Sequence, residues 1–247
     1  MTGAARTEYY GDYWRAPELE HSEHLRWKIE ATRHKTRVRA ARSVLDVGCG
    51  SGAVLAAIAD AGKRLCGVEM SSEAVAALRA RGIEGHAVDL EGGRLPFADG
   101  EFEVVLCFDV LEHVFAPERL LAEIRRVLAD DGAALLCVPN TLNLFNRLVF
   151  LSGRFVDVMD TSHRSGELFS NHLRLFNKDL FERLLDGGGF RVAQREFYFP
   201  ARFSDPGVGM PSSLARLVTL PRLHERLPTL FAMGFFYTCE KARRAAL

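Results

Sequence analysis

The chain has 247 residues, enough for one large domain with a substantial buried core. Its 32 Lys and Arg residues balance 32 Asp and Glu residues, and 48% of the residues are hydrophobic, as in an ordinary soluble domain. Because the balance leaves no basic surplus, we expect no nucleic-acid partner.

The five cysteines include no C-x-x-C pair. Cys49, Cys66, Cys107 and Cys137 have small or apolar neighbours, so we predict reduced thiols in a core. The opening MTGAARTEYYGDYW holds no apolar signal-peptide core, and no stretch of the chain approaches the ~20 apolar residues of a membrane span. We therefore expect a cytoplasmic protein without a transmembrane segment.

From residue 43 the chain alternates short apolar runs with amphipathic stretches, which is typical of a parallel sheet covered on both faces. The predicted strands are SVLDVG (43–48), RLCGVEM (64–70), EGHAVDL (84–90), EFEVVLCF (101–108) and AALLCVP (133–139). The predicted helices are GAVLAAIADAG (52–62), SSEAVAALRARG (71–82) and APERLLAEIRRVLADDG (116–132), the last with a stripe that ends at Leu128 and with Gly132 as its stop.

The flanking regions are less regular. We divide the chain into an N-terminal aromatic segment and helix (1–42) and a main domain (43–247), with lid insertions at about 141–175 and 201–227. In NKDLFERLLDGGGF, Asn177 is predicted to cap a helix. FRVAQREFYF (190–199) and TLFAMGFFYTCEKA (229–242) are predicted to be the last strands.

The segment SVLDVGCGSGA places three glycines at alternate positions where a strand turns into a helix. Glycines there let a ligand approach the main chain at the carboxyl edge of a parallel sheet. Gly48, Gly50 and Ala53, with Glu69 about 20 residues on, also satisfy a dinucleotide pattern. A phosphate-loop nucleotidase is excluded because no Lys-Ser/Thr follows the glycines.

Several stretches in order resemble class I S-adenosylmethionine-dependent methyltransferases: DVGCGSG, GVEMS, VDLE, LPFADGEFEVVLCFDVLEHV and HLRLFNKDLFERLLDGGGF. They cover roughly residues 40 to 200, and they are most similar to the branch that contains the ubiquinone-pathway O-methyltransferases. The resemblance implies a Rossmann-like, doubly wound α/β fold with a seven-stranded, mostly parallel sheet whose last strand is antiparallel. It also implies S-adenosylmethionine as the cofactor and S-adenosylhomocysteine as the product.

The resemblance further implies where this cofactor binds. The methionine half would lie against the first turn, the ribose hydroxyls on Glu69, the adenine near Asp89, and the sulfonium near Phe108. A carboxylate at Glu69 can accept two hydrogen bonds from a cis-diol, which are of the stronger, charge-assisted kind. The full set of predicted cofactor-binding residues is Asp46, Gly48, Cys49, Gly50, Gly52, Glu69, Met70, Asp89, Leu90 and Phe108.

Methyl transfer needs the reacting atoms in line and often a base for the acceptor's proton. His113 in DVLEHV follows the fourth strand, so it is the candidate catalytic base, although a structural role is the competing interpretation. The spacing of Asp160, His163, Glu167 and His172 fits no ligand pattern, so we predict no metal site there.

We therefore predict an S-adenosylmethionine-dependent methyltransferase acting on a small-molecule acceptor, with transfer to oxygen. Apolar lid residues favour an aromatic or lipid-like acceptor: Phe145, Phe150, Phe155 and Phe169. Two alternatives stay open. One is a regulatory protein that binds the cofactor without transferring a methyl group, and the other is a dinucleotide-dependent oxidoreductase, which rests on the glycine turn alone.

Overall fold

The computed structural model describes residues 23–151, 153, 172–199 and 222–242. These residues build a seven-stranded sheet in the order β3-β2-β1-β4-β5-β7-β6. The strands are β1 (Ser43–Val47), β2 (Arg64–Glu69), β3 (Glu84–Ala87), β4 (Phe102–Phe108), β5 (Leu128–Pro139), β6 (Phe190–Tyr198) and β7 (Gly234–Lys241). β1 to β5 pair in parallel, whereas β7 is antiparallel to both of its neighbours, β5 and β6. The predicted fold class is confirmed, including the antiparallel last strand.

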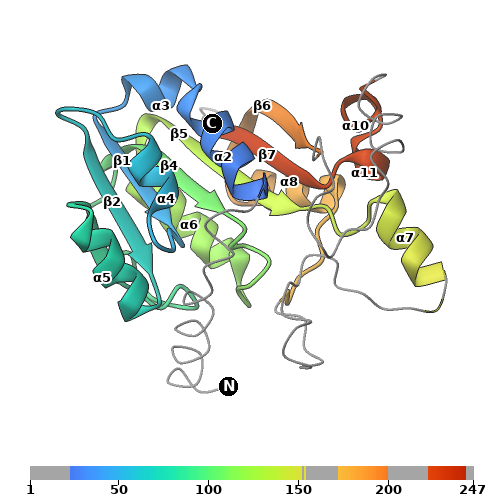
Figure 1. Cartoon of the computed structure of the whole chain (residues 1–247), viewed down its shortest axis with the longest axis horizontal. Coiled ribbons are helices and arrows are strands. Elements are labelled where there is room, and N and C mark those ends of the chain that lie inside the picture. Colours follow the sequence, from blue (N-terminus) through green and yellow to red (C-terminus); the bar gives the residue numbers. More distant parts are fainter. Residues whose placement is uncertain (1–22, 152, 154–171, 200–221, 243–247) are drawn as a thin grey trace, which may run out of the picture.

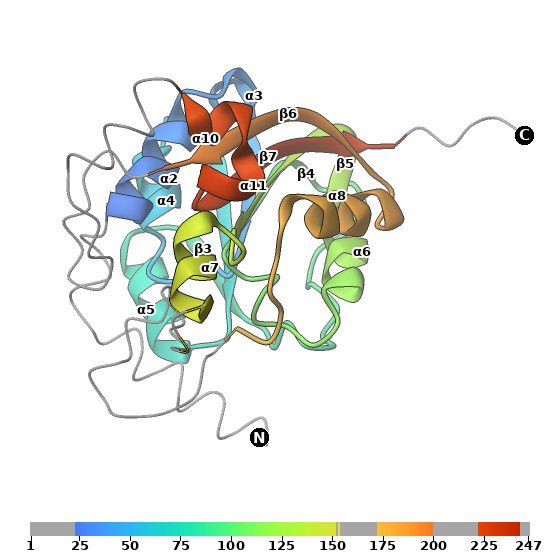
Figure 2. The ribbon, with the colours of Figure 1, turned by 90° about the vertical axis from the view of Figure 1, so that its right-hand side faces the viewer.

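Helices cover both faces of the sheet (Figures 1 and 2). One face carries α2 (Glu23–Arg33), α3 (Thr36–Ala40), α4 (Ala53–Ala57) and α5 (Ser72–Ala80), and the other carries α6 (Pro117–Val127) and α8 (Lys178–Gly187). Alternate strand residues divide between two cores: Leu45 and Val47 face α6 and α8, and Val44 faces α4 and α5. This alternation explains why the strands read as continuous apolar runs.

Beyond β5 the chain adds α7 (Leu144–Leu151), and before β7 it adds α10 (Leu223–Arg226) and α11 (Pro228–Phe231). All three lie together beyond one end of the sheet (Figures 1 and 2). The buried Asn140 side-chain amide links the end of β5 to α11, because it donates to the carbonyls of Pro228, Thr229 and Ala232. No helix within the described residues is long and apolar enough to cross a membrane.

Local signals placed several helix ends correctly. Ser71 accepts a hydrogen bond from the Ala74 N–H at the start of α5, and Asn177 accepts one from the Leu180 N–H at the start of α8. All five cysteines are buried and free, as the prediction of reduced core thiols requires.

Three expectations about element boundaries were wrong. The first helix ends at Ala57 rather than near Gly62. The helix before β5 ends at Val127, and Leu128 begins the strand by pairing with Phe102. Residues 228–231 form α11 instead of extending the last strand. In each case the apolar pattern of the sequence continues past the residue at which the backbone hydrogen bonding changes. Most of the two predicted insertions, with Phe155 and Phe169, lies outside the described residues, as do Asp160, His163 and Glu167.

Candidate functional site

The predicted site residues gather at the carboxyl edge of β1, β2 and β4. The order 3-2-1-4-5 reverses direction between β1 and β4, and this reversal point is where open α/β sheets bind ligands. Asp46 lies in β1, Glu69 ends β2, and Phe108 ends β4. The sheet therefore brings together residues that are more than 60 positions apart in the chain.

The glycine turn after β1 requires its glycines. Gly48, Gly50 and Gly52 all have positive φ angles, of 74°, 51° and 79°, a region that L side chains rarely adopt. A Cβ at Gly48 would also lie 2.4 Å from Val110, and one at Gly52 would lie 2.2 Å from Leu78. Gly48 is thus limited by the loop after β4, and Gly52 by its packing on α5.

The Glu69 side chain links the turn after β1 to the turn after β2. Its carboxylate is 6% exposed and accepts hydrogen bonds from the Gly50 N–H at 3.0 Å and the Met70 N–H at 2.7 Å. Burial raises the pKa of Glu69, and these backbone donors partly oppose the rise. Because a carboxylate has about four lone-pair sites, it can hold the turn and still accept from a ligand.

Asp46 is a second buried acid at this edge, with 3% exposure. Burial raises the pKa of Asp46 to about 7; the positive charge of Lys28 opposes the rise, and the negative charge of Glu69 adds to it. Near neutral pH this carboxyl group therefore exists in both protonation states. A cationic ligand beside it would favour the ionised form.

An ion pair that the sequence did not reveal joins α2 to the loop after β4. The Lys28 ammonium of α2 lies 2.6 Å from the Asp109 carboxylate, and the two side chains are only 12% and 22% exposed. Burial alone would lower the pKa of Lys28, but the negative charges of Asp109 and Glu112 keep it raised. Asp109 itself has a φ of 54°, an uncommon value for a residue other than glycine. Asp109 and Glu112 belong to the DVLEHV segment, but nothing in the sequence indicated that Asp109 would pair with Lys28 of α2.

Aromatic rings anchor α2 beside this pair. The Trp27 ring lies 4.8 Å from Tyr198 and 5.4 Å from Phe236, measured between ring centroids. Phe236 in turn lies 5.1 Å from Phe108. Phe108, the predicted sulfonium neighbour, is therefore part of an aromatic chain that runs from β4 through β7 to α2.

The predicted adenine residues occupy the more open part of the edge. Asp89 is exposed, and its side chain accepts a hydrogen bond from the Glu91 N–H at 3.0 Å, which is a turn-forming contact. Leu90 and Met70 are half-buried, while Cys49 is buried and Gly67 packs against its sulfur-bearing side chain. Asp89 thus stabilises its own turn, and its side chain is accessible to solvent.

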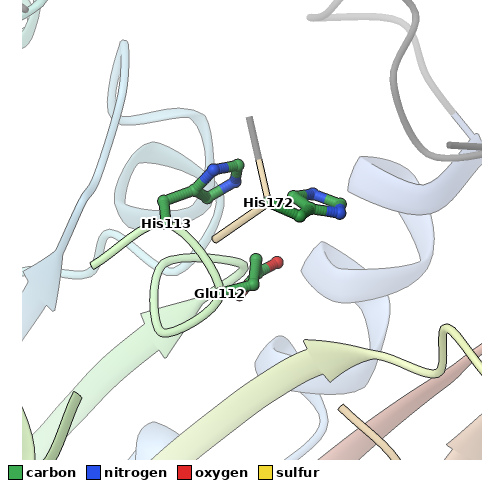
Figure 3. Close-up of side chains that lie close together, drawn as sticks. All are labelled: Glu112, His113 and His172. Atoms are coloured by element: carbon green, nitrogen blue, oxygen red, sulfur yellow. The ribbon is translucent and has the colours of Figure 1, made fainter. Parts of the chain in front are cut away.

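His113 lies in the loop after β4, between the fully buried Glu112 and His172 of the returning chain. The His113 and His172 rings are 4.8 Å apart at an angle of 63°. Figure 3 shows both rings and the Glu112 carboxylate close together, on two separate backbone segments. One donor atom from each residue lies within 4.8 Å of the other two, a group able to hold a metal ion.

Comparison with known proteins bears on the part of the chain that holds most of these residues. Residues 45–136 match the family described as "Methyltransferase domain". A probable S-adenosylmethionine-dependent methyltransferase of Mycolicibacterium smegmatis is 34% identical over 156 residues, which make up 62% of this chain and 53% of that protein.

Solved methyltransferases share the fold. A SAM-dependent methyltransferase from Archaeoglobus fulgidus aligns with a TM-score of 0.60 at 17% identity, covering 94% of this chain and 98% of that one. Magnesium protoporphyrin IX methyltransferase from Synechocystis, solved with bound SAH, gives a TM-score of 0.58 at 14% identity, covering 91% and 84%. At identities of 17% and 14%, these two structures show that the chain shares their fold. The chain spans about half the length of the curated relatives that it matches.

Proposed function

We propose that the protein transfers a methyl group from S-adenosylmethionine to an oxygen of a small-molecule acceptor, as in the ubiquinone-pathway branch of the family. The observation that carries this proposal is the set of buried acids and positive-φ glycines at the carboxyl edge of β1 and β2, within the segment that matches the methyltransferase family. A sulfonium cofactor supplies an activated methyl group, and the remaining work of the protein is to bind, orient and handle a proton.

The residues present fit such a cofactor. Gly48, Gly50 and Gly52 hold the turn after β1 in a positive-φ conformation, and its backbone N–H groups can donate to the amino-acid end of the cofactor. Glu69 offers acceptor oxygens for ribose hydroxyls. Asp46, buried and next to Glu69, suits the positive charge of the methionine half. We assign the adenine to Asp89 and Leu90, and the sulfonium side to Phe108.

We assign His113 as the base that takes the acceptor's proton. In this reaction the acceptor oxygen forms a bond to the methyl carbon, the carbon–sulfur bond breaks, and the proton passes to the imidazole. Support comes from its position on the loop directly after β4, at the same edge as Asp46 and Glu69. The competing structural role predicts that His113→Gln lowers cofactor affinity or stability instead of turnover alone.

The acceptor pocket is assigned to the region that follows β5. There α7 carries exposed apolar residues, with Leu148 at 56% and Leu151 at 83% exposure. Such a surface favours an aromatic or lipid-like acceptor over a highly charged one. We also keep two further expectations as proposals: residues 43–247 form one domain with lid insertions, and the protein works in the cytoplasm.

Calorimetric titration with S-adenosylmethionine, S-adenosylhomocysteine and NAD tests the cofactor assignment directly. We expect micromolar binding of the first two and none of the third. Binding of NAD instead would favour an oxidoreductase. Binding of S-adenosylmethionine without acceptor-dependent formation of S-adenosylhomocysteine, across catechols, phenols and hydroxylated lipids, would favour a regulatory protein.

A further inference from the structure

We propose that Glu112, His113 and His172 form a binding site for a divalent transition-metal ion such as zinc. A carboxylate and two imidazoles are a donor set that zinc and related ions use in catalytic sites. The three donor atoms already lie within 4.8 Å of one another. Around a zinc ion with bonds of ~2.0–2.1 Å, neighbouring donors are about 3 to 3.5 Å apart, so side-chain torsions alone can complete the site.

Backbone hydrogen bonds hold the two contributing segments together. The Glu112 carbonyl accepts from the Leu173 N–H at 2.8 Å and from the Arg174 N–H at 3.1 Å. The Arg174 guanidinium also donates to the Phe115 carbonyl. His172 is therefore fixed beside His113 although 58 residues separate them in the chain, and ligand positions set by the main chain reduce the ordering that metal binding requires.

The burial of the three side chains fits a metal site that is accessible to solvent on one side. Glu112 is fully buried, so its negative charge lies in a region of low dielectric constant, where a cation is attracted strongly. His113 and His172 are half-buried and lie nearer the surface. Three protein ligands leave at least one coordination position for water or for a ligand oxygen, as in catalytic sites.

The site lies on the loop after β4, at the edge where the methyl group would be transferred, so the inference deepens the proposed function. A metal ion there would bind the acceptor oxygen and lower the pKa of its hydroxyl group. The hydroxyl proton would then pass to water. His113 would be a metal ligand, so this inference keeps the proposed methyl transfer to oxygen and replaces the assignment of His113 as the base. This role rests on the proposed function, but metal binding itself does not.

The sequence offered no sign of this site. His172 was considered only with Asp160, His163 and Glu167, whose spacing fits no metal pattern, and we predicted none. Glu112 and His113 are adjacent in the chain, and adjacent residues alone do not define a site. The returning segment brings the third ligand to them.

The test is calorimetric titration of zinc into the purified, metal-free full chain in the absence of cofactor, followed by Mn²⁺ and Mg²⁺. We expect one zinc ion per chain with micromolar or tighter affinity, and binding at least tenfold weaker in each of His113→Asn, His172→Asn and Glu112→Gln. The oxygen-preferring Mg²⁺ should bind at least tenfold more weakly than zinc. His86→Asn is the control, because His86 is a half-buried histidine on the edge strand β3, where its Nε2 lies 2.9 Å from the Glu84 carboxylate.

Circular dichroism and S-adenosylmethionine titration of every variant separate loss of the metal site from loss of the fold. His172→Asn, at the half-buried rim, is the variant least disruptive to the core. Absence of stoichiometric zinc binding by the parent protein, or zinc affinity unchanged in all three ligand variants, would overturn the proposal. Zinc binding without any S-adenosylmethionine binding would leave the site standing and remove the proposed function.

Discussion

The buried pair between Lys28 and Asp109 makes a strong prediction about stability. Replacing Lys28 with Met keeps most of the side-chain volume but leaves the Asp109 carboxylate without its cation. At 2.6 Å the two charges attract each other by about 6 kcal/mol if the effective dielectric constant is 20, although desolvation offsets much of this. Removing one partner of a buried pair costs about 3–5 kcal/mol. With 12% and 22% exposure of the two side chains, we expect about 3 kcal/mol.

Urea unfolding at pH 7.5, followed by circular dichroism, measures this free energy. A double variant, Lys28→Met with Asp109→Asn, removes both charges and should recover at least half of the loss. Asn is a suitable replacement because it tolerates the positive φ of residue 109. Arg33→Met removes an exposed ion pair from the same helix and should leave the unfolding midpoint unchanged.

The reasoning is refuted if Lys28→Met destabilises the protein no more than Arg33→Met does. It is also refuted if the double variant is as unstable as the sum of its two single variants, because the charges would then be independent. Loss of Lys28 should in addition raise the pKa of Asp46, whose ionised form it favours.

Three further predictions concern the site and the core. Burial raises the pKa of Asp46 to about 7, above its ordinary value of 3.8, so its contribution to stability is complete below pH 4 and is lost as the pH rises through 7. Asp46→Asn should therefore stabilise the protein by up to about 4 kcal/mol at pH 8 and little at pH 4, and unfolding curves that shift equally at both pH values would contradict this. Gly48→Ala should weaken S-adenosylmethionine binding at least tenfold, because its Cβ would meet Val110 and displace the turn; Gly62→Ala, also at positive φ but with nothing within 4 Å of the added Cβ, should not, and equal affinities would show that the turn does not hold the cofactor. The five cysteines should resist Ellman's reagent at pH 8 until the protein unfolds, since burial raises the pKa of Cys66 and Cys239 to about 12; rapid labelling of the native protein would show that the core opens.

The sequence alone determined the elements with strong local signals. Apolar runs predicted β1, β2, β4 and β5, because strands covered on both faces bury nearly every side chain. Ser71 and Asn177 predicted helix starts through their own side-chain hydrogen bonds. The glycines of the segment SVLDVGCGSGA predicted the turn from β1 into α4. All these features depend on a few neighbouring residues, and so they can be read from the chain.

Only the tertiary structure decided the contacts between segments that are far apart in the chain. The Lys28–Asp109 pair joins residues 81 positions apart, and the Glu112, His113 and His172 cluster depends on two backbone hydrogen bonds between distant segments. Whether Leu128 continues α6 or begins β5 was likewise settled by its pairing with Phe102. Periodicity shows that a side chain is buried, but it carries no information about which distant residue is its partner. That choice is made when the sheet assembles and the helices pack on it.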